Sequence, residues 1–317
     1  MTDGSQSGHH HDHDDRGHYH AGHVHAPASF GAAFAIGIAL NFGFVTVEAV
    51  YGFFANSLAL LADAGHNFGD VLALAVAWLA SELTKRAPSP RFTYGLRGSS
   101  ILAALFNAVF LLLTVGAISL EAIKRLGAPE VVAGATVMIV AAIGIVVNGV
   151  TAALFASGRK GDINLRGAFL HQASDAFVST GVVVAGLVIL LTGWGWLDPA
   201  VSLAVNAVVV WGTWGLLRES LGMSLAGVPA SVDPGAVRDF LATRPGVASI
   251  HDFHLWPMST TEFALTCHLV MPAGHPGDPF LHELAAEVAK RFGVAHSTLQ
   301  IETDPNLFCA LAREGSL

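Results

Sequence analysis

The chain has 317 residues, of which 53% are hydrophobic and 13% are charged, and its mean hydropathy is +0.56. About a quarter of the residues of a typical soluble domain are charged, so this composition excludes an ordinary soluble protein and indicates a membrane protein. The formal net charge of −8 argues against nucleic acid as a partner.

The first 29 residues form a low-complexity tail rich in His and Asp. Such a tract cannot bury a core, so we expect it to be disordered. It also lacks the basic region and apolar core of a secretory signal. The histidines predict either a weak, multivalent metal collector or a solvated tail that merely happens to bind metal, and an affinity tag is a third interpretation.

Six apolar segments follow, each long enough to cross a hydrocarbon core of about 30 Å, which needs roughly 20 residues. They comprise residues 30–54, 57–83, 99–123, 131–157, 165–192 and 198–218. Lys and Arg gather in the loops after the second and fourth segments and directly after the sixth, which predicts that both termini are cytoplasmic. We therefore expect residues 30–226 to be a six-helix domain in a membrane.

In residues 227–317, apolar and polar residues alternate as in a soluble domain. The phrase Ser231-Val232-Asp233-Pro234 predicts the start of a helix that runs to about residue 243. Strands are expected over 246–256, 262–271 and 297–303, with a second helix over 279–292. The order αββαβ predicts a compact α+β domain in the cytoplasm. Both cysteines lie in this part, so no disulfide framework is expected.

Two of the apolar segments contain the same spacing of His and Asp, at residues 66–70 (HNFGD) and 171–175 (HQASD). A spacing of four places both side chains of each pair on one face of a helix, about one turn apart. Together His66, Asp70, His171 and Asp175 supply two imidazoles and two carboxylates, which is a complete set of ligands for a tetrahedral divalent metal. Ionisable residues within membrane segments are costly and mark an ion or substrate path by default.

The expected depths of the two pairs agree with a single site. At 1.5 Å per residue, His66 and Asp70 lie roughly 14 and 20 Å below the outer surface, and His171 and Asp175 lie roughly 12 and 18 Å above the inner one. In a core of about 30 Å the pairs are level. Two nitrogen and two oxygen ligands without thiolate suit Zn²⁺, with Co²⁺ and Cd²⁺ as alternatives. Metal and protons compete for these side chains, which predicts an antiporter.

Other polar residues lie at membrane depth near this predicted site. Asp63 shares the helix face of His66 and is either a group that orients an imidazole or a polar residue near the outer mouth. Asn41, Glu48 and Asn148 are interpreted as groups that hold helices together or line a cavity.

Four phrases of the sequence resemble the cation diffusion facilitators, and in particular their zinc-type branch with bacterial cobalt, zinc and cadmium resistance proteins. They are residues 57–67 (SLALLADAGHN), 91–95 (RFTYG), 166–171 (RGAFLH) and 251–256 (HDFHLW). The resemblance implies a homodimer of six-span protomers with a ferredoxin-like, metallochaperone-like cytoplasmic domain. It also implies export of divalent metal in exchange for protons by alternating access, with Zn²⁺ as cargo and no organic cofactor.

The resemblance further implies a metal site in the cytoplasmic domain. It points to His251, His268, His296 and Glu302, and to Cys309 near the chain end, while Asp304 and His282 fit a related bacterial variant. From spacing alone, His251, His254 and Trp256 are also compatible with ordinary strand positions, although metal binding in this domain is favoured, and His275 is expected to bind no metal. Some relatives have another site in the loop after the second span, but residues 84–96 contain neither His nor Asp, so none is predicted there.

Two other classes of function compete with the exporter. An intramembrane metalloenzyme would need an open coordination position and a general base, and the sequence has no His-Glu-x-x-His phrase. A membrane-anchored metal sensor would use the soluble domain to signal and the spans as an anchor. The paired ligands favour a secondary transporter and not an enzyme.

Overall fold

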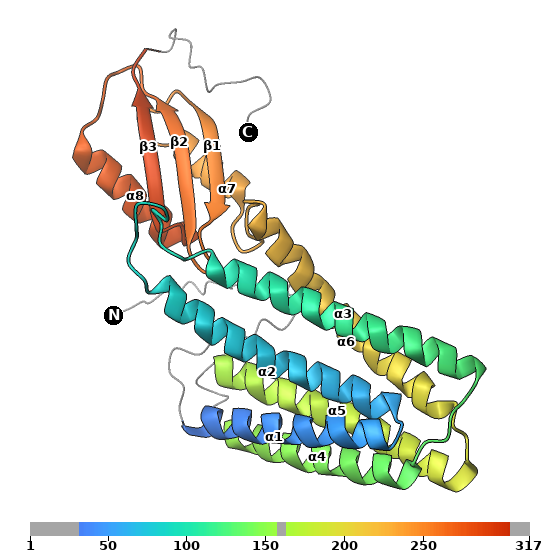
Figure 1. Cartoon of the computed structure of the whole chain (residues 1–317). Coiled ribbons are helices and arrows are strands. Elements are labelled where there is room, and N and C mark those ends of the chain that lie inside the picture. The colour runs from blue at the N-terminus through green and yellow to red at the C-terminus, as the bar shows by residue number, and fades with distance from the viewer. Residues whose placement is uncertain (1–31, 157–162, 305–317) are drawn as a thin grey trace, which may run out of the picture.

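The computed structural model describes residues 32–156 and 163–304 (Figure 1). The His-rich tail and Cys309 lie outside these residues. Six long helices come first: α1 (Ala32–Phe54), α2 (Leu58–Thr84), α3 (Ser99–Gly127), α4 (Gly134–Ala156), α5 (Ile163–Thr192) and α6 (Leu197–Ser224). A small domain follows, with α7 (Pro234–Ala242), β1 (Ser249–Pro257), β2 (Phe263–Val270), α8 (Asp278–Phe292) and β3 (His296–Glu302). The predicted fold class, helical membrane domain plus αββαβ, is confirmed.

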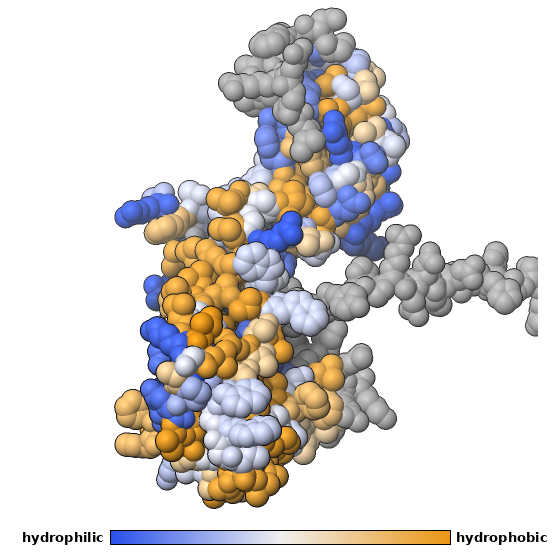
Figure 2. Space-filling view, turned by 90° about the vertical axis from the view of Figure 1, so that its right-hand side faces the viewer, coloured by the Kyte–Doolittle hydropathy of each residue, from blue (hydrophilic) through white to orange (hydrophobic). Residues whose placement is uncertain are grey.

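The helical part has the surface of a membrane protein. Within the described part of the chain, the length and composition of four helical stretches are sufficient to cross a membrane, and Ile38–Phe54 of α1 forms a shorter apolar helix. The four are Ser99–Gly127, Gly134–Leu154, Phe169–Thr192 and Leu197–Ser224. Figure 2 shows apolar residues covering this region and hydrophilic residues concentrated over the small domain. The hydrophobic exterior fits a lipid environment, because soluble proteins rarely expose apolar patches of this extent to water.

The helices pack as a group of four with α3 and α6 paired alongside (Figure 1). Buried apolar residues of α1, α2, α4 and α5 form one core, with Phe44, Leu60, Val140 and Val182 among them. Helices α4 and α5 approach each other closely, since a Cβ on Gly134 would lie 2.8 Å from the carbonyl oxygen of Gly186. Small residues at such crossings let helix backbones meet, which fixes α5 against the bundle.

The small domain is a three-stranded sheet covered by helices on one face. β1 pairs with β2 in antiparallel orientation, and β2 pairs with β3 in parallel. Leu265, Cys267 and Leu269 point from β2 into a core shared with α7 and α8. The first strand begins three residues later than predicted, because Gly246 adopts a positive φ of 85° in the turn that precedes it.

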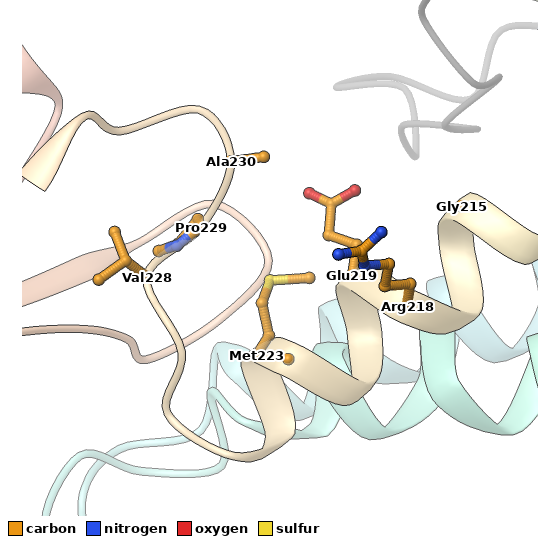
Figure 3. A pocket seen from close by; sticks show the side chains of 8 residues that line it. Gly215, Arg218, Glu219, Met223, Val228, Pro229 and Ala230 are labelled. Atoms are coloured by element: carbon orange, nitrogen blue, oxygen red, sulfur yellow. The ribbon is translucent and has the colours of Figure 1, made fainter.

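The small domain touches the membrane part at the loop and helix end that join α2 to α3. Arg97 Nη1 lies 2.8 Å from Glu262 Oε2, and the backbone N–H of Thr260 donates to Ser100 Oγ at 3.1 Å. An open hollow of about 330 Å³ lies where α6 leads into the linker to α7, lined by Arg218, Glu219 and Pro229 among others (Figure 3). None of the predicted metal ligands lines it.

Candidate metal centre

The two His/Asp pairs meet between α2 and α5. His66 Nε2 lies 3.7 Å from Asp70 Oδ2 and 3.5 Å from Asp175 Oδ1. His171 Nε2 lies 3.2 Å from Asp70 Oδ2 and 3.6 Å from Asp175 Oδ2. Each imidazole therefore contacts both carboxylates. We call these four side chains the quartet.

The spacing of the quartet is compatible with one tetrahedral ion. Ligand atoms at about 2.0–2.2 Å from zinc are separated from each other by about 3.3–3.6 Å, which is the tetrahedral edge. The four nitrogen–oxygen distances of 3.2–3.7 Å lie close to that range. Asp70, His171 and Asp175 form the tightest group, with ligand atoms within 4.8 Å of one another. The rings of the two histidines have centroids 6.1 Å apart, so closure around an ion requires His66 to approach His171.

The donor chemistry of the quartet also fits a metal. Asp175 is 3% exposed, and the Oδ2 atom of Asp70 and the Nδ1 atom of His66 are buried without a hydrogen-bond partner among the described residues. Buried polar atoms in native proteins nearly always have a partner. An ion held between α2 and α5 would satisfy Asp70 and neutralise both carboxylates.

The neighbouring polar residues have definite partners in most cases. Asp63 is fully buried and accepts a hydrogen bond from Ser179 Oγ at 3.0 Å, so it is not an exposed group at the outer mouth. Asn41 Nδ2 donates to Gln172 at 3.4 Å, and Asn67 Nδ2 donates to Glu48 at the same distance. Asn148 is buried, and its amide has no hydrogen-bond partner within the described chain.

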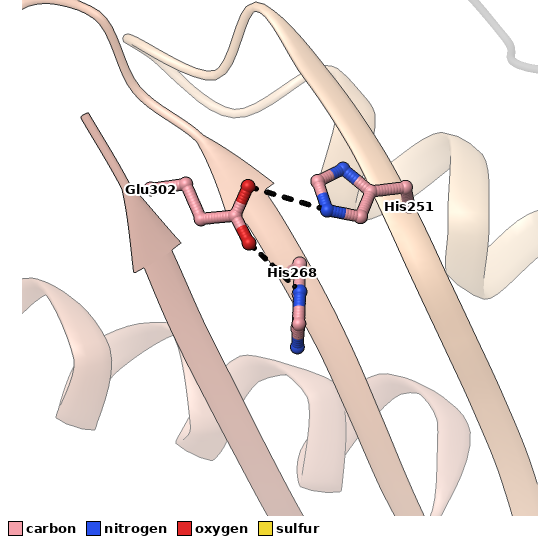
Figure 4. Close-up of side chains that lie close together, drawn as sticks. All are labelled: His251, His268 and Glu302. Atoms are coloured by element: carbon pink, nitrogen blue, oxygen red, sulfur yellow. Dashed lines mark ion pairs between the residues drawn. The ribbon is translucent and has the colours of Figure 1, made fainter. Parts of the chain in front are cut away.

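A second cluster of possible ligands lies on the sheet of the small domain. His251 and His268 are directly opposite each other on β1 and β2. Glu302 contacts both, with Oε2 3.3 Å from His251 Nε2 and Oε1 3.0 Å from His268 Nδ1 (Figure 4). The three ligand atoms lie within 4.8 Å of one another, which is compatible with a metal site.

Asp252 contacts His268 of the second cluster through the ring nitrogen that does not contact Glu302. The register of β1 shifts between His251 and His254, and this bulge gives Asp252 a positive φ of 50°. Its Oδ2 lies 3.5 Å from His268 Nε2, and its Oδ1 lies 3.0 Å from His254 Nε2. A carboxylate on one ring nitrogen of a histidine fixes the orientation of the ring, so Asp252 directs the Nδ1 atom of His268 toward Glu302.

The structure does not bring the other predicted ligands of this domain to the cluster. His296 starts β3 and pairs with Ala264, so it lies roughly 20 Å along the strand from Glu302, with its ring against Tyr94 at 5.5 Å. Asp304 is exposed just beyond β3, and His282 is exposed on α8. The Nδ1 atom of His275 accepts the backbone N–H of Gly277 at 3.0 Å. Cys309 lies beyond the described residues.

Comparison with known proteins identifies the family. The family model for the cation efflux transmembrane domain matches residues 34–223, and the model for the cytoplasmic domain of cation efflux proteins matches residues 229–304. The chain belongs to the cation diffusion facilitators. The resemblance inferred from the sequence is thereby confirmed, and this facilitator is a multi-pass membrane transporter for cation efflux.

Curated relatives match almost the whole facilitator chain. The cation efflux system protein CzcD of Alcaligenes sp. (strain CT14) is 36% identical over 287 residues, which is 90% of this chain and 91% of the relative. A cadmium, cobalt and zinc/H(+)-K(+) antiporter of Bacillus subtilis (strain 168) is 33% identical, with 89% and 92% covered. The zinc transporter ZitB of Escherichia coli (strain K12) is 35% identical, with 83% and 84% covered.

Sequence reasoning missed two residues that support the facilitator's candidate sites. Asp252 was visible only as part of the phrase at 251–256, because its role depends on a bulge that no residue type predicts. Ser179 lies one turn after Asp175 on the same helix face, and that spacing could have indicated a partner for a polar group of α2.

Proposed function

We propose that this facilitator exports a divalent cation in exchange for protons and that the quartet is its transport site. The single observation that supports this proposal is the ring of four contacts, in which each of two imidazoles lies 3.2–3.7 Å from both carboxylates. The ligands come from two different helices. A relative movement of α2 and α5 would therefore open the site to one side of the membrane or the other, as alternating access requires.

Charge balance supports proton exchange at this site. A divalent cation neutralises the two carboxylates of the quartet when both imidazoles are neutral. When the cation leaves, protons on the imidazoles restore the balance, because each imidazole already faces two carboxylates. Occupation by metal and occupation by protons exclude each other, which is the requirement for an antiporter.

Zinc is the proposed principal cargo, with cobalt and cadmium as further cargo. Two nitrogens and two oxygens in a tetrahedral arrangement suit these ions, whereas Cu⁺ prefers sulfur and Mg²⁺ prefers oxygen alone. The names of these relatives mention zinc, cadmium and cobalt, in agreement with this choice. Residues 84–96 contain neither His nor Asp, so we assign no second membrane site to that loop.

We further propose a homodimer with both termini in the cytoplasm of a bacterial cell and the membrane domain in its inner membrane. Residues 1–29 would be a tail that collects metal, 30–226 the transport domain, and 227–317 a domain for dimer formation and metal binding. The cluster of His251, His268 and Glu302 would hold a regulatory ion in this last domain.

Zinc uptake into proteoliposomes tests the transport proposal. The full chain should accumulate zinc when a pH gradient is imposed and should dissipate that gradient as zinc enters. Asp70→Ala and Asp175→Ala should abolish uptake, while Ser174→Ala, which changes an exposed residue beside Asp175, should not. Normal uptake in both Asp variants would refute the assignment. A chain that binds zinc without moving it would instead favour a sensor, and turnover of a membrane substrate would favour a metalloenzyme.

A further inference from the structure

The quartet is closed on the side that points away from the small domain, which we call the far side. Helix α2 ends and α5 begins near the small domain (Figure 1), so Asp70 and His171 are the nearer pair of ligands. Their side chains are 23% and 32% exposed, whereas those of the farther pair, His66 and Asp175, are 21% and 4% exposed. Two turns farther along α5, Val182 has 0% exposure. Access to the quartet therefore decreases toward the far side.

One hydrogen bond joins α2 and α5 directly beyond the quartet on the far side. Ser179 Oγ donates to Asp63 Oδ2 at 3.0 Å, and both residues have 0% exposure. Asp63 precedes His66 by three residues, which is about 4.5 Å along α2. Ser179 follows Asp175 by four residues, which is about 6 Å along α5. We call this contact the α2–α5 bond. On the far side of the quartet, the described residues of these two helices form no other hydrogen bond with each other.

Helices α1 and α4 pack closely beside the α2–α5 bond. A Cβ on Gly144 of α4 would lie 2.7 Å from Phe44 Cζ of α1 and 3.4 Å from Ser179 Oγ. Phe44 belongs to the buried apolar core of α1, α2, α4 and α5, together with Leu60 and Val140. A cation cannot cross such a core while it stays packed, because a charge without polar partners is very costly there. Exit on the far side therefore requires α2 and α5 to separate at their bond.

The far ends of α2 and α5 are attached to different neighbours. Asp198 of α6 accepts from the backbone N–H groups of Leu58 at 2.6 Å and Ala59 at 3.3 Å, at the start of α2. The far half of α5 packs instead on α4, where a Cβ on Gly186 would lie 3.1 Å from the carbonyl oxygen of Gly134. A movement of α4 and α5 away from α2 would thus keep both attachments and break the α2–α5 bond.

The strength of a single hydrogen bond suits a contact that opens and closes. In the closed arrangement, the hydroxyl of Ser179 donates to the carboxyl group of Asp63. Once the helices separate, both groups would form hydrogen bonds with water in the opened path. Such an exchange changes an equilibrium constant by roughly tenfold. The bond can therefore favour the closed arrangement without preventing its opening.

We propose that the α2–α5 bond is the latch of a gate on the far side of the transport site. Asp63 and Ser179 keep the quartet closed toward the face opposite to the small domain, and they separate each time a cation leaves on that face. Neither residue binds the metal, and both act by positioning α2 against α5. This inference rests on the proposed transport function and adds to it the contact that closes the exit.

Thiol labelling of the reconstituted full chain tests the gate. The reporter is Val182→Cys, because Val182 is fully buried one turn beyond the α2–α5 bond. This chain also carries Cys309→Ser, while Cys267 stays in place because it has 0% exposure in the small domain. A membrane-impermeant methanethiosulfonate reagent is supplied on the far side. A closed gate should protect the reporter thiol, and an open gate should expose it.

Removal of either partner should open the gate more often. Ser179→Ala and Asp63→Ala should each raise the labelling rate roughly tenfold, as expected for the loss of one buried hydrogen bond. Thr180→Ala is the matched control, because Thr180 is exposed and its hydroxyl bonds the carbonyl oxygen of Ala176 at 2.8 Å within α5. It should change the rate by less than about twofold. Equal rates in Ser179→Ala and Thr180→Ala would overturn the proposal.

A double variant and a conservative variant separate a latch from a purely structural role. If Asp63 and Ser179 act through one bond, the chain with both alanines should label no faster than either single variant. Asp63→Asn should label as slowly as the reporter chain, because the amide oxygen also accepts from Ser179. Additive effects of the two alanines, or rapid labelling of Asp63→Asn, would refute the latch.

Labelling during transport separates this inference from the transport proposal. With zinc on the side of the small domain and a pH gradient, the reporter chain should label faster than without zinc, because the gate opens in each cycle. Unchanged labelling in a chain that transports zinc would refute the gate. Failure of zinc transport by the wild-type chain would instead refute the proposed function, while the comparison of Ser179→Ala with Thr180→Ala would still decide whether the bond closes this face.

Discussion

Replacement of Asp175 by Asn is the sharpest test of the quartet. The side chain keeps its size and loses its negative charge, and the residue it replaces is 3% exposed. Its two oxygens lie 3.5 Å from His66 Nε2 and 3.6 Å from His171 Nε2, so it contacts both imidazoles. We expect Asp175→Asn to fold and to bind zinc far more weakly than the wild-type chain.

The expected loss follows from the charge of the site. A divalent ion in the wild-type quartet is balanced by two carboxylates, whereas in Asp175→Asn it leaves one uncompensated positive charge among helices. Removal of one partner from a buried, hydrogen-bonded charge pair typically costs about 3–5 kcal/mol. Since every 1.4 kcal/mol is tenfold in affinity, the dissociation constant for zinc should rise by roughly 100- to 4,000-fold.

The assay is a competition titration with a zinc-chelating dye on the reconstituted full chain. The reference chain and the Asp175→Asn chain both carry His251→Ala, so that zinc binding at the cluster of the small domain does not contribute to the measured affinity. Ser174→Ala is the matched control, because Ser174 is exposed on α5 and only bonds the carbonyl oxygen of Leu170 at 2.9 Å. Its affinity should change by less than about threefold, as expected for an exposed substitution. An Asp175→Asn chain with an equally small change would refute the quartet as the binding site.

Three further predictions concern the small domain and its contact with the membrane part. Asp252→Ala should weaken metal binding at the His268 cluster by about 10- to 100-fold, measured by Co²⁺ absorption, because the imidazole loses its orienting carboxylate; unchanged affinity would contradict that role. Burial raises the pKa of the Cys267 thiol to about 12. In a chain with Cys309→Ser, the thiol of Cys267 should therefore react with maleimide at pH 8 only after denaturation. Rapid labelling of the folded chain would argue against its burial. The side chains of Arg97 and Glu262 are both about 40% exposed. A double-mutant cycle of thermal unfolding should therefore give a coupling free energy below about 1 kcal/mol. A larger value would mean that the contact is more than a surface ion pair.

The arrangement of the quartet could be expected from the sequence because it depends on regular helix geometry alone. A spacing of four fixes which side chains share a face, and the length of a membrane span fixes their depth. The expectation that His66 is level with Asp175, and His171 with Asp70, agrees with contacts of 3.5 and 3.2 Å. Whether a metal occupies the site stays a prediction that the titration above decides.

The site of the small domain could not be assembled in the same way. Its members come from three strands, and their meeting depends on the register of each pairing. His296 and Glu302 flank the same strand in the sequence, but parallel pairing places Glu302 beside Val270 and His296 beside Ala264, at opposite ends. Asp252 depends in addition on a bulge in β1. Neither register nor bulge is encoded by the spacing of His and Asp residues.

The buried acids of the membrane domain show why residue type alone could not assign their roles. Asp198, Asp175 and Glu48 are all nearly inaccessible carboxyl groups in long apolar helices. Three donors at a helix start compensate the first, and two imidazoles face the second. The third accepts a hydrogen bond from the side chain of Asn67 at 3.4 Å. Because the cost of a buried charge depends on its partners, the donors around the first hold it at the start of α2, whereas the imidazoles that face the second make it part of the proposed transport site.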